Sequence, residues 1–220
     1  MFEKIEYIKN LSFFDSLEDE HIKNIDNISN LIKYPKGSML YYENDNKDKI
    51  FFLISGLLKV YKMDKYDNEI FLYHIHKNSL ISELTSVNEN SIYCFSNAEF
   101  MEDSIVLEVD FKYFRENFLS KNILTDKFIN EILLKTHQLH CVVNREIVFD
   151  ATAKVAFMLN DDLEIFNSLK RQEVSFMLHI QPETLSRVLK RLKRDDIIEI
   201  DHTKVIIKNQ QALQEIYKGY

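Results

Sequence analysis

The first half of the chain carries two different patterns of apolar positions. Within residues 1–30 apolar side chains recur at helical spacing, which predicts helices, one of them capped by Ser16. From residue 31 to about residue 110 the apolar residues form short runs rich in β-branched and aromatic side chains, which is typical of strands. The expected strands are Ser38–Tyr42, Ile50–Ile54, Leu57–Lys62, Glu69–Ile75, Ile92–Phe95 and Ile105–Val109.

Asparagine marks the turns between these strands. The chain has 3 glycines and 2 prolines but 18 asparagines, and Asn tolerates left-handed backbone better than most residues. Turns are therefore expected at Asn44–Asn46, Asp67–Asn68, Lys77–Asn78 and Asn88–Asn90. Short strands separated in this way predict a compact antiparallel roll or barrel.

Residues 111–147 contain neither Gly nor Pro and predict one long helix. At about 1.5 Å per residue this helix would exceed ~50 Å, which is longer than a small roll can cover. Its apolar stripe therefore predicts a parallel seam with a second copy of the chain. The stripe consists of Leu124, Phe128, Ile132, Leu139, Val143 and Ile147.

A hinge is expected at Phe149-Asp150, because Asp150 can cap a new helix over 151–159. The charge balance also changes here. Residues 151–220 hold 11 basic and 10 acidic side chains, whereas the other 150 residues hold 17 and 25. The net charge of −7 thus belongs to the N-terminal part and does not exclude DNA binding by the C-terminal part.

Residues 171–200 predict a helix, a turn, a second helix and a strand. The first helix is expected near 171–178, with Ile180 buried in the turn, and the second near 182–194, with Pro182 in its first turn. Strands 197–200 and 204–207 around Asp201-His202-Thr203 would then form a hairpin wing.

The second of these helices is amphipathic and basic. Its inward positions are Leu185, Val188, Leu189 and Leu192, and its outward positions are Glu183, Ser186, Arg187, Lys190, Arg191, Lys193 and Arg194. Five basic side chains against one acidic side chain fit the DNA major groove, where the start of the helix reaches base edges and Lys and Arg contact phosphates. Taken alone, the same charges could form a solvated surface.

Composition excludes several classes of protein. With 45% hydrophobic and 29% charged residues the chain is globular. It has no apolar run long enough to cross a membrane and no signal peptide at its start, so a cytoplasmic protein without a membrane partner is expected. Two cysteines, Cys94 and Cys141, are too few to hold an iron–sulfur cluster or a structural zinc ion.

Over essentially its full length the chain resembles the CRP/FNR family of bacterial transcription regulators. The segments that carry the resemblance are Tyr34–Lys62, like the opening of the family's β-roll, Ile81–Leu84, like the start of its phosphate-binding cassette, and Arg171–Ile198, like its helix-turn-helix. The resemblance implies an α+β fold with an N-terminal antiparallel β-roll sensor (1–110), a dimerisation helix with a hinge (111–149) and a C-terminal winged helix-turn-helix (150–220). It also implies a homodimer that binds a palindromic double-stranded DNA operator and works with RNA polymerase.

The resemblance assigns DNA-contacting roles to particular residues. Glu183, Ser186 and Arg187 fall on the family's base-reading E-x-x-S-R pattern, and the Ser resembles the FNR branch, which implies TTGA-like half-sites. His179 stands where the family's turn often has Gly, and His can adopt left-handed backbone at some cost. The expected phosphate contacts are Lys170, Arg171, Gln172, Gln181 and Lys190.

The same resemblance predicts that cyclic AMP is not the effector. The cyclic-nucleotide branch places an Arg after its G-E-L cassette to pair with the phosphate, but here Ser82-Glu83-Leu84 is followed by Ile92-Tyr93-Cys94, and no Arg precedes Arg115. A buried phosphate without a cation would be costly. The corresponding effector pocket would be formed by Glu83, Tyr93, Cys94, Leu139 and His140.

Three alternatives stay open for the sensor part. His140 and Cys141 could hold haem or a metal, which would make the chain a gas or redox sensor of the same family, and either cysteine could act as a low-pKa thiol. A cupin-like metalloenzyme is disfavoured because six residues separate His76 from Glu83, so an enzyme is not expected. The third alternative is a sensor that binds only protein partners. The full set of candidate ligands is His74, His76, Cys94, His137, His140 and Cys141.

Overall fold

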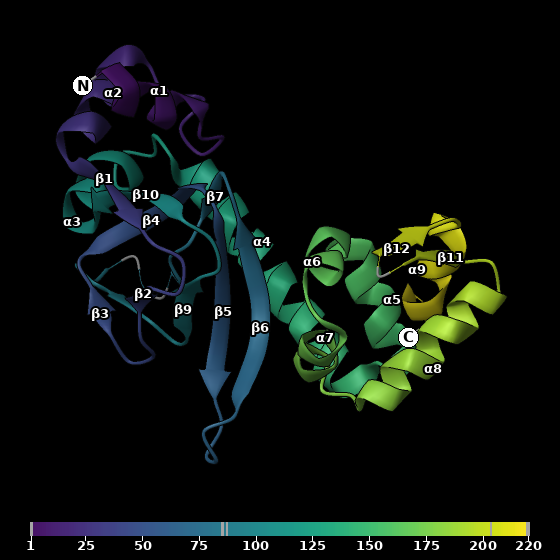
Figure 1. The fold of residues 1–220 in the computed structure, drawn as a ribbon. Coiled ribbons are helices and arrows are strands. Elements are labelled where there is room, and N and C mark those ends of the chain that lie inside the picture. Colours follow the sequence, from purple (N-terminus) through teal and green to yellow (C-terminus); the bar gives the residue numbers. More distant parts are fainter. Residues whose placement is uncertain (1, 85, 87, 203, 219–220) are drawn as a thin grey trace. The chain divides into compact units, whose positions relative to one another are not determined.

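The structure, a computed structural model, describes residues 2–84, 86, 88–202 and 204–218 (Figure 1). The chain divides into two compact units, Met1–Leu139 and His140–Tyr220, which we call the N-terminal and C-terminal units. The predicted α+β fold is confirmed: antiparallel sheets come first, a long helix follows, and a helix-turn-helix lies near the C-terminus.

Two helices begin the N-terminal unit, α1 (Phe2–Asn10) and α2 (Asp19–Asn27). The prediction that Ser16 caps a helix is wrong. The hydrogen bond from Leu17 N–H to the Phe14 carbonyl keeps this segment in turns, and α2 begins only after Glu18. Figure 1 shows both helices at one end of the β-roll, where they bury their apolar side chains against its sheet.

The β-roll consists of two four-stranded antiparallel sheets and a short strand pair. Their strand orders are β1-β10-β4-β7, β2-β9-β5-β6 and β3-β8. All six predicted strands are present, although most of their bounds shift by one or two residues, and β1, β3, β7 and β9 were not predicted. The bounds are β1 Ser29–Tyr34, β2 Met39–Tyr41, β3 Asn46–Lys47, β4 Lys49–Ser55, β5 Leu57–Met63, β6 Glu69–His76, β7 Ser79–Leu80, β8 Ile92–Tyr93, β9 Asn97–Phe100 and β10 Ser104–Asp110.

The asparagine-rich turns adopt the backbone expected of them. Asn44, Asp67 and Asn78 have φ values of 71°, 61° and 62°. Gly56 joins β4 to β5 at a φ of 98°, and a Cβ at this position would lie 2.0 Å from Oγ of Ser104. Polar residues with left-handed backbone therefore replace glycine at most turns, whereas a close approach requires the glycine at position 56.

The prediction of one helix over residues 111–147 is wrong at its N-terminal end. The segment forms α3 (Phe111–Phe114), a π-helical turn η1 (Arg115–Leu119), and then a turn in which Asn122 has a φ of 57°. The long helix α4 begins at Thr125 and ends at Val143, where a second π-helical turn, η2 (Asn144–Val148), follows. The left-handed Asn122 ends the first helical segment because an α-helix cannot continue through that backbone conformation.

The predicted apolar stripe divides between three environments. Leu124 and Phe128 are 1% and 4% exposed and belong to the core that the N-terminal unit forms by itself. Ile132 and Leu139 line a cavity described below. Val143 and Ile147 are exposed and belong neither to this core nor to the cavity. Four of the six stripe residues thus face the N-terminal core or its cavity, because the β-roll packs against the first part of α4.

The C-terminal unit packs helices and a hairpin around one apolar core. Asp150 caps α5 as predicted, its Oδ1 accepting hydrogen bonds of 2.8 Å from the N–H groups of Thr152 and Ala153. The helix-turn-helix bounds agree with those predicted to within one residue. Thr203, in the predicted wing turn, lies outside the described residues. The elements are α5 Ala151–Asp161, α6 Leu163–Ser168, α7 Arg171–Met177, α8 Pro182–Arg194, β11 Ile198–Asp201, β12 Lys204–Ile207 and α9 Gln210–Lys218.

None of the helices in the described part of the chain is both long enough and apolar enough to cross a membrane.

Candidate nucleic-acid interface and effector cavity

Helix α8 presents the expected polar face. Its four inward leucine and valine side chains are buried in the C-terminal core. Glu183, Ser186 and Arg187 are exposed, and their spacing of three and four residues places them on one face of the helix. Arg187 donates a hydrogen bond of 3.1 Å to Oγ1 of Thr184, so its guanidinium lies along the first turns of α8.

The remaining basic residues of α8 have different surroundings. Arg191 donates to Oγ1 of Thr152 on α5, and Arg194 pairs with Asp195 at 3.1 Å. Lys190 and Lys193 are exposed. Arg191 therefore ties α8 to α5, and the lysines are better placed to contact a ligand from outside.

The predicted phosphate contacts gather at the starts of α7 and α8. Lys170 is the N-cap of α7, and its N–H donates to Oε2 of Glu173 at 2.6 Å. Arg171 is half-buried and stacks on the Phe166 ring, 4.6 Å from its centre, and burial lowers its pKa. Gln172 and Gln181 are exposed, Gln181 as the N-cap of α8. Because Arg171 also lines a small cavity with Ser186 and Lys190, the predicted base-reading and phosphate-contacting residues are neighbours.

Glu146, which the sequence analysis missed, holds the turn between α7 and α8 through His179. His179 adopts left-handed backbone with a φ of 52°, and its Nδ1 lies 2.9 Å from Oε2 of Glu146 on η2. Glu146 also pairs with Arg145 at 2.7 Å and lies 3.8 Å from Nζ of Lys154. Burial would raise the pKa of Glu146, but the hydrogen bonds from His179 and Arg145 outweigh it and lower the pKa to about 2. No local pattern marks Glu146, since two of its partners, His179 and Lys154, lie on other elements of the C-terminal unit.

A cavity of about 430 Å³ lies in the N-terminal unit, between the β-roll and one face of α4. Two of the five predicted effector-pocket residues line it, Glu83 and Leu139. Tyr93 and Cys94 do not, because the Tyr93 hydroxyl bonds to Asn44 and Cys94 is buried in the core of the roll. His140 is an exposed residue of the C-terminal unit. The lining residues are Lys62, Tyr73, Glu83, Leu84, Phe95, Ile132, Lys135, Thr136 and Leu139.

Lys135 is the charged residue of this cavity that the sequence analysis missed. Its Nζ donates to the carbonyl of Ile81 at 3.3 Å and lies 5.7 Å from the centre of the Tyr73 ring. Burial lowers the pKa of Lys135 to about 8, although Glu131 and Glu83 oppose the shift. The residue could have been found from the helical spacing of Ile132, Lys135 and Leu139, which puts a lysine on an otherwise apolar face.

Of the cysteine and histidine candidates, His74 and His76 lie near each other on β6, with ring centres 6.4 Å apart. Burial, with a further contribution from Glu83, raises the pKa of Cys94 to about 12, and burial also raises the pKa of Cys141. Both shifts go against the alternative of a low-pKa thiol at either position. On β6, His74 is buried and His76 exposed. Within the described ranges, no three His, Cys, Asp or Glu side chains are grouped so that they could hold a metal ion.

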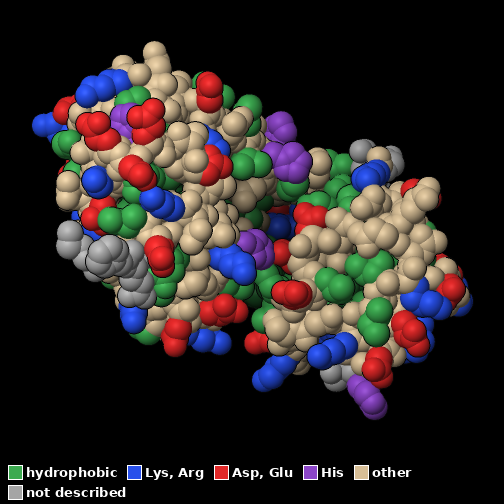
Figure 2. Space-filling model, turned by 90° about the horizontal axis from the view of Figure 1, so that it is seen from above, with side chains coloured by type: hydrophobic (Ala, Val, Ile, Leu, Met, Phe, Trp, Pro, Cys, Tyr) green, Lys and Arg blue, Asp and Glu red, His purple; other side chains and the backbone are tan. Residues whose placement is uncertain are grey.

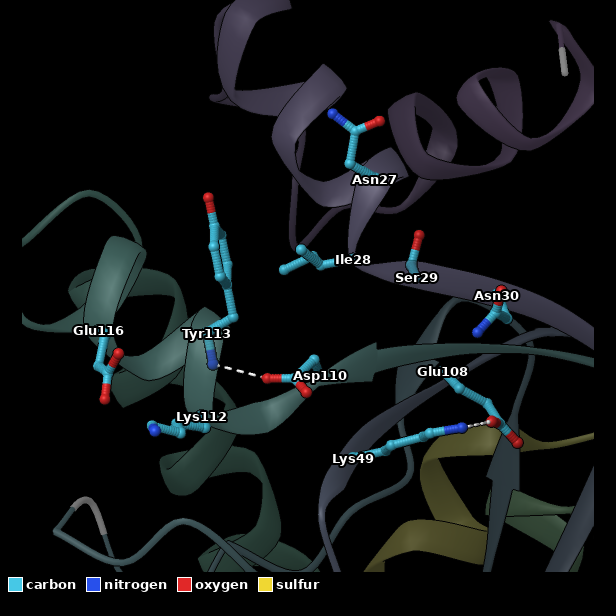
Figure 3. A pocket seen from close by; sticks show the side chains of 10 residues that line it. All are labelled: Asn27, Ile28, Ser29, Asn30, Lys49, Glu108, Asp110, Lys112, Tyr113 and Glu116. Carbon is cyan, nitrogen blue, oxygen red and sulfur yellow. Dashed lines mark hydrogen bonds and ion pairs between the residues drawn. The ribbon is translucent and has the colours of Figure 1, made fainter.

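A larger cavity, of about 530 Å³, lies between α2, β10 and α3 (Figure 3). Several of its polar side chains form bonds within the protein. Glu108 pairs with Lys49 and accepts from the Tyr34 hydroxyl, both at 2.8 Å, and Asp110 accepts the Tyr113 N–H at 2.7 Å as the cap of α3. This arrangement stabilises the end of the roll and does not indicate a ligand.

The surface charge of the N-terminal unit is mixed on the face seen in Figure 2, where acidic and basic side chains are interspersed. This agrees with the acidic balance of residues 1–150 and gives that face no resemblance to a DNA-binding surface, which would be predominantly basic.

Comparison with known proteins places two families of domain on the chain. Residues 31–121 match the model of the cyclic nucleotide-binding domain, and residues 154–216 match that of the Crp-like helix-turn-helix domain. The anaerobic regulatory protein of Bacillus subtilis is 21% identical over 212 residues, covering 91% of this chain and 89% of the relative. The cyclic AMP receptor protein of Thermus thermophilus is 21% identical over 201 residues, covering 84% and 87%. These relatives are regulators of transcription and not enzymes.

Solved structures show the same fold. A variant of CooA from Carboxydothermus hydrogenoformans has a TM-score of 0.73 at 19% identity, covering 94% of this chain and 95% of that one.

Proposed function

The chain belongs to the CRP/FNR family of transcription regulators, and from this membership we propose that it acts as a homodimer that reads a palindromic DNA operator and responds to a signal other than cyclic AMP. In this proposal residues 1–110 form the sensor, 111–149 the dimerisation helix and hinge, and 150–220 the DNA-binding domain. RNA polymerase is the further partner that the family implies.

The observation that carries the proposal is the exposed face of α8 with Glu183, Ser186 and Arg187. A glutamate oxygen can accept from a cytosine amino group, and an arginine can bridge N7 and O6 of guanine. Arg171 and Lys190, which lie beside this face, supply cations for the neighbouring phosphates. A TTGA-like half-site contains bases that suit these side chains.

Dimerisation is supported by an exposed apolar strip on α4 and η2, which we call the α4 strip: Ile129, Leu133, Val143 and Ile147. Leu133 and Ile147 are 60% and 79% exposed. Their spacing approximates a heptad repeat, the pattern by which two parallel helices pack together. A second copy of the chain is the partner that fits, because two-fold symmetry would present two copies of α8 to successive turns of a palindrome.

The cavity chemistry supports an effector other than cyclic AMP. None of its described lining residues is an arginine, the residue that pairs with the phosphate in the cyclic-nucleotide branch. Arg115 instead donates to the carbonyl of Asn88 at 2.6 Å. A signal that binds two states of the dimer unequally would shift the DNA-binding domains between them.

Haem or a metal at His140 and Cys141 is the alternative signal-binding group. Its test is an ultraviolet–visible spectrum with metal analysis of protein purified without oxygen, before and after haem is offered. A stoichiometric Soret band that changes in His140→Ala would replace the cavity as the sensor site.

The proposed function is tested by selecting duplexes from a random-sequence pool with the purified protein. We expect enrichment of a palindrome with TTGA-like half-sites, and its half-sites should lie about one DNA turn apart, centre to centre. Selection is repeated with cyclic AMP, which should change neither the enriched sequence nor its affinity. A pool without enrichment would contradict DNA reading, and a requirement for cyclic AMP would contradict the proposed signal.

A further inference from the structure

The cavity beside α4 has apolar walls and includes the side chain of Lys135. Leu84 and Phe95 line it from the roll, and Ile132 and Leu139 line it from the helix. Its volume of about 430 Å³ lies within the range of ~300–1,000 Å³ that small-molecule sites occupy. The walls therefore fit a small ligand with an apolar body.

Lys135 supplies a positive charge that the protein only partly satisfies. An ammonium group has three donors, and the one hydrogen bond found for it among the described residues is the long one, 3.3 Å, to the carbonyl of Ile81. Ile81 is fully buried, so this hydrogen bond joins the ammonium to the backbone of a core residue. A buried charge of this kind is stabilised by an anionic partner.

Glu83 limits which anion can enter. Its two carboxylate oxygens accept hydrogen bonds of 2.8 Å from the Phe95 N–H and the Ser96 hydroxyl, which hold it in the wall as a fixed negative charge. The second lysine, Lys62, is paired with Glu43 at 2.8 Å. Among the described residues no carboxylate forms an ion pair with Lys135, and one such positive charge beside one fixed negative charge favours a ligand with a single negative charge over a doubly charged phosphate ester.

We propose that this cavity binds a small organic acid with one negative charge, whose carboxylate pairs with Lys135 and whose apolar body lies against Leu84, Phe95, Ile132 and Leu139. This inference rests on the proposed function, since it names the ligand class of the sensor. Because Lys135 and Leu139 belong to α4, the bound acid would contact the helix that carries the α4 strip.

The test is isothermal titration calorimetry of the full chain with hexanoate and 3-phenylpropionate. The matched probes are hexanamide and 3-phenylpropionamide, which keep the apolar body and lose the charge, and phenyl phosphate, which has a doubly charged head. We expect at least one acid to bind, at least tenfold more tightly than its amide and than phenyl phosphate. The proposal is wrong if neither acid binds at millimolar concentration. It is also wrong if the acid binds less than tenfold more tightly than its amide or than phenyl phosphate.

Variants assign the binding to Lys135. Lys135→Met should weaken binding of the acid at least tenfold, and Lys62→Met, at the paired lysine, should leave it within threefold. Lys135→Gln serves as a second variant if Lys135→Met does not fold, as judged by circular dichroism. Unchanged binding in the Lys135 variant, or an equal loss in Lys62→Met, would overturn the assignment. Calorimetry measures acid binding and operator selection measures DNA reading, so failure of one is distinguishable from failure of the other.

Discussion

Gly37 and Gly56 both adopt positive φ, 80° and 98°, in different surroundings. A Cβ at Gly37 would meet no atom within 4 Å, whereas a Cβ at Gly56 would collide with Ser104. We predict that Gly37→Ala lowers the free energy of unfolding by about 1–2 kcal/mol, the cost of left-handed backbone for a residue with a Cβ. Gly56→Ala should lower it further, because Ser104 must also move. Urea denaturation of both variants measures the difference, and equal losses would contradict the crowding at Gly56.

Arg187 and Lys190 are both exposed on α8, but we assign them different roles. Arg187→Ala should cost about 1–3 kcal/mol of operator binding per half-site and little on random DNA, because it removes a contact to a base edge. Lys190→Ala should weaken binding to both duplexes alike, because phosphates are the same in every sequence. Anisotropy titrations of the selected operator and a scrambled duplex at one salt concentration compare the two. If Arg187→Ala lost the same affinity for both duplexes, Arg187 would not be a base-reading residue.

Single-residue expectations held where the cause was local. Asn44, Asp67 and Asn78 adopt left-handed backbone because their own side chains tolerate it, and Asp150 caps α5 through its immediate neighbours. Ser16 failed as a cap because the neighbouring turns and the burial of Phe13 and Phe14 decide where α2 begins.

At the scale of elements, Glu146 connects three of them. It lies on η2, contacts His179 in the turn between α7 and α8, and lies near Lys154 on α5. Lys154 in turn donates to the carbonyl of Leu178, 3.3 Å away. The π-helical turn η2, which follows α4, is therefore bonded to the turn that precedes α8.

The pKa of Glu146 is about 2, well below the ordinary value of 4.5 for a glutamate, and this difference predicts how the connection depends on pH. A carboxyl group whose pKa is lowered on folding stabilises the folded state fully above its unfolded pKa, and this contribution disappears as the pH falls through the folded value. Glu146→Gln should therefore be less stable than the wild type at pH 7, by at most about 3 kcal/mol. The difference should shrink between about pH 4.5 and pH 2.

Urea denaturation across this range measures the effect, with Glu164→Gln, on the exposed surface of α6, as the matched control. Equal pH profiles for the wild type and Glu146→Gln would show that Glu146 is not stabilised by its partners.

The bounds of an element were predicted well where its own residues carry clear start signals and a complete apolar face. They were predicted poorly where only the apolar periodicity was available. Helix α8 has the expected bounds because Pro182 starts it and a complete apolar face continues through it. Residues 111–124 were predicted as helix, but Phe111, Phe114 and Phe118 are buried in the N-terminal core, and the turn at Asn122 lets the chain pack there. The periodicity could not distinguish a straight helix from a bent segment with the same buried side.

At the scale of the whole molecule, α4 offers a matched pair for testing dimerisation. Leu133 and Leu134 are 60% and 58% exposed, but they are neighbours in sequence and lie about 100° apart around the helix. Leu133→Glu should convert the dimer to a monomer and abolish binding to a palindrome, because it places a charge in the α4 strip. Leu134→Glu should leave the dimer intact. Sedimentation velocity decides between them, and the same result for both variants would mean that the α4 strip is not the seam.

The sequence by itself determined the order of the parts and the exposed face of α8 that we propose reads DNA. These follow from local properties: runs of β-forming residues, turn residues, and an amphipathic basic helix whose exposed side chains need no distant partner. Tertiary structure decided where α4 begins, which part of its apolar stripe is free for a second copy, and which residues form the cavity. Glu146 and the buried position of Cys94 depend on side chains brought together from distant parts of the chain, and no local pattern contains that information.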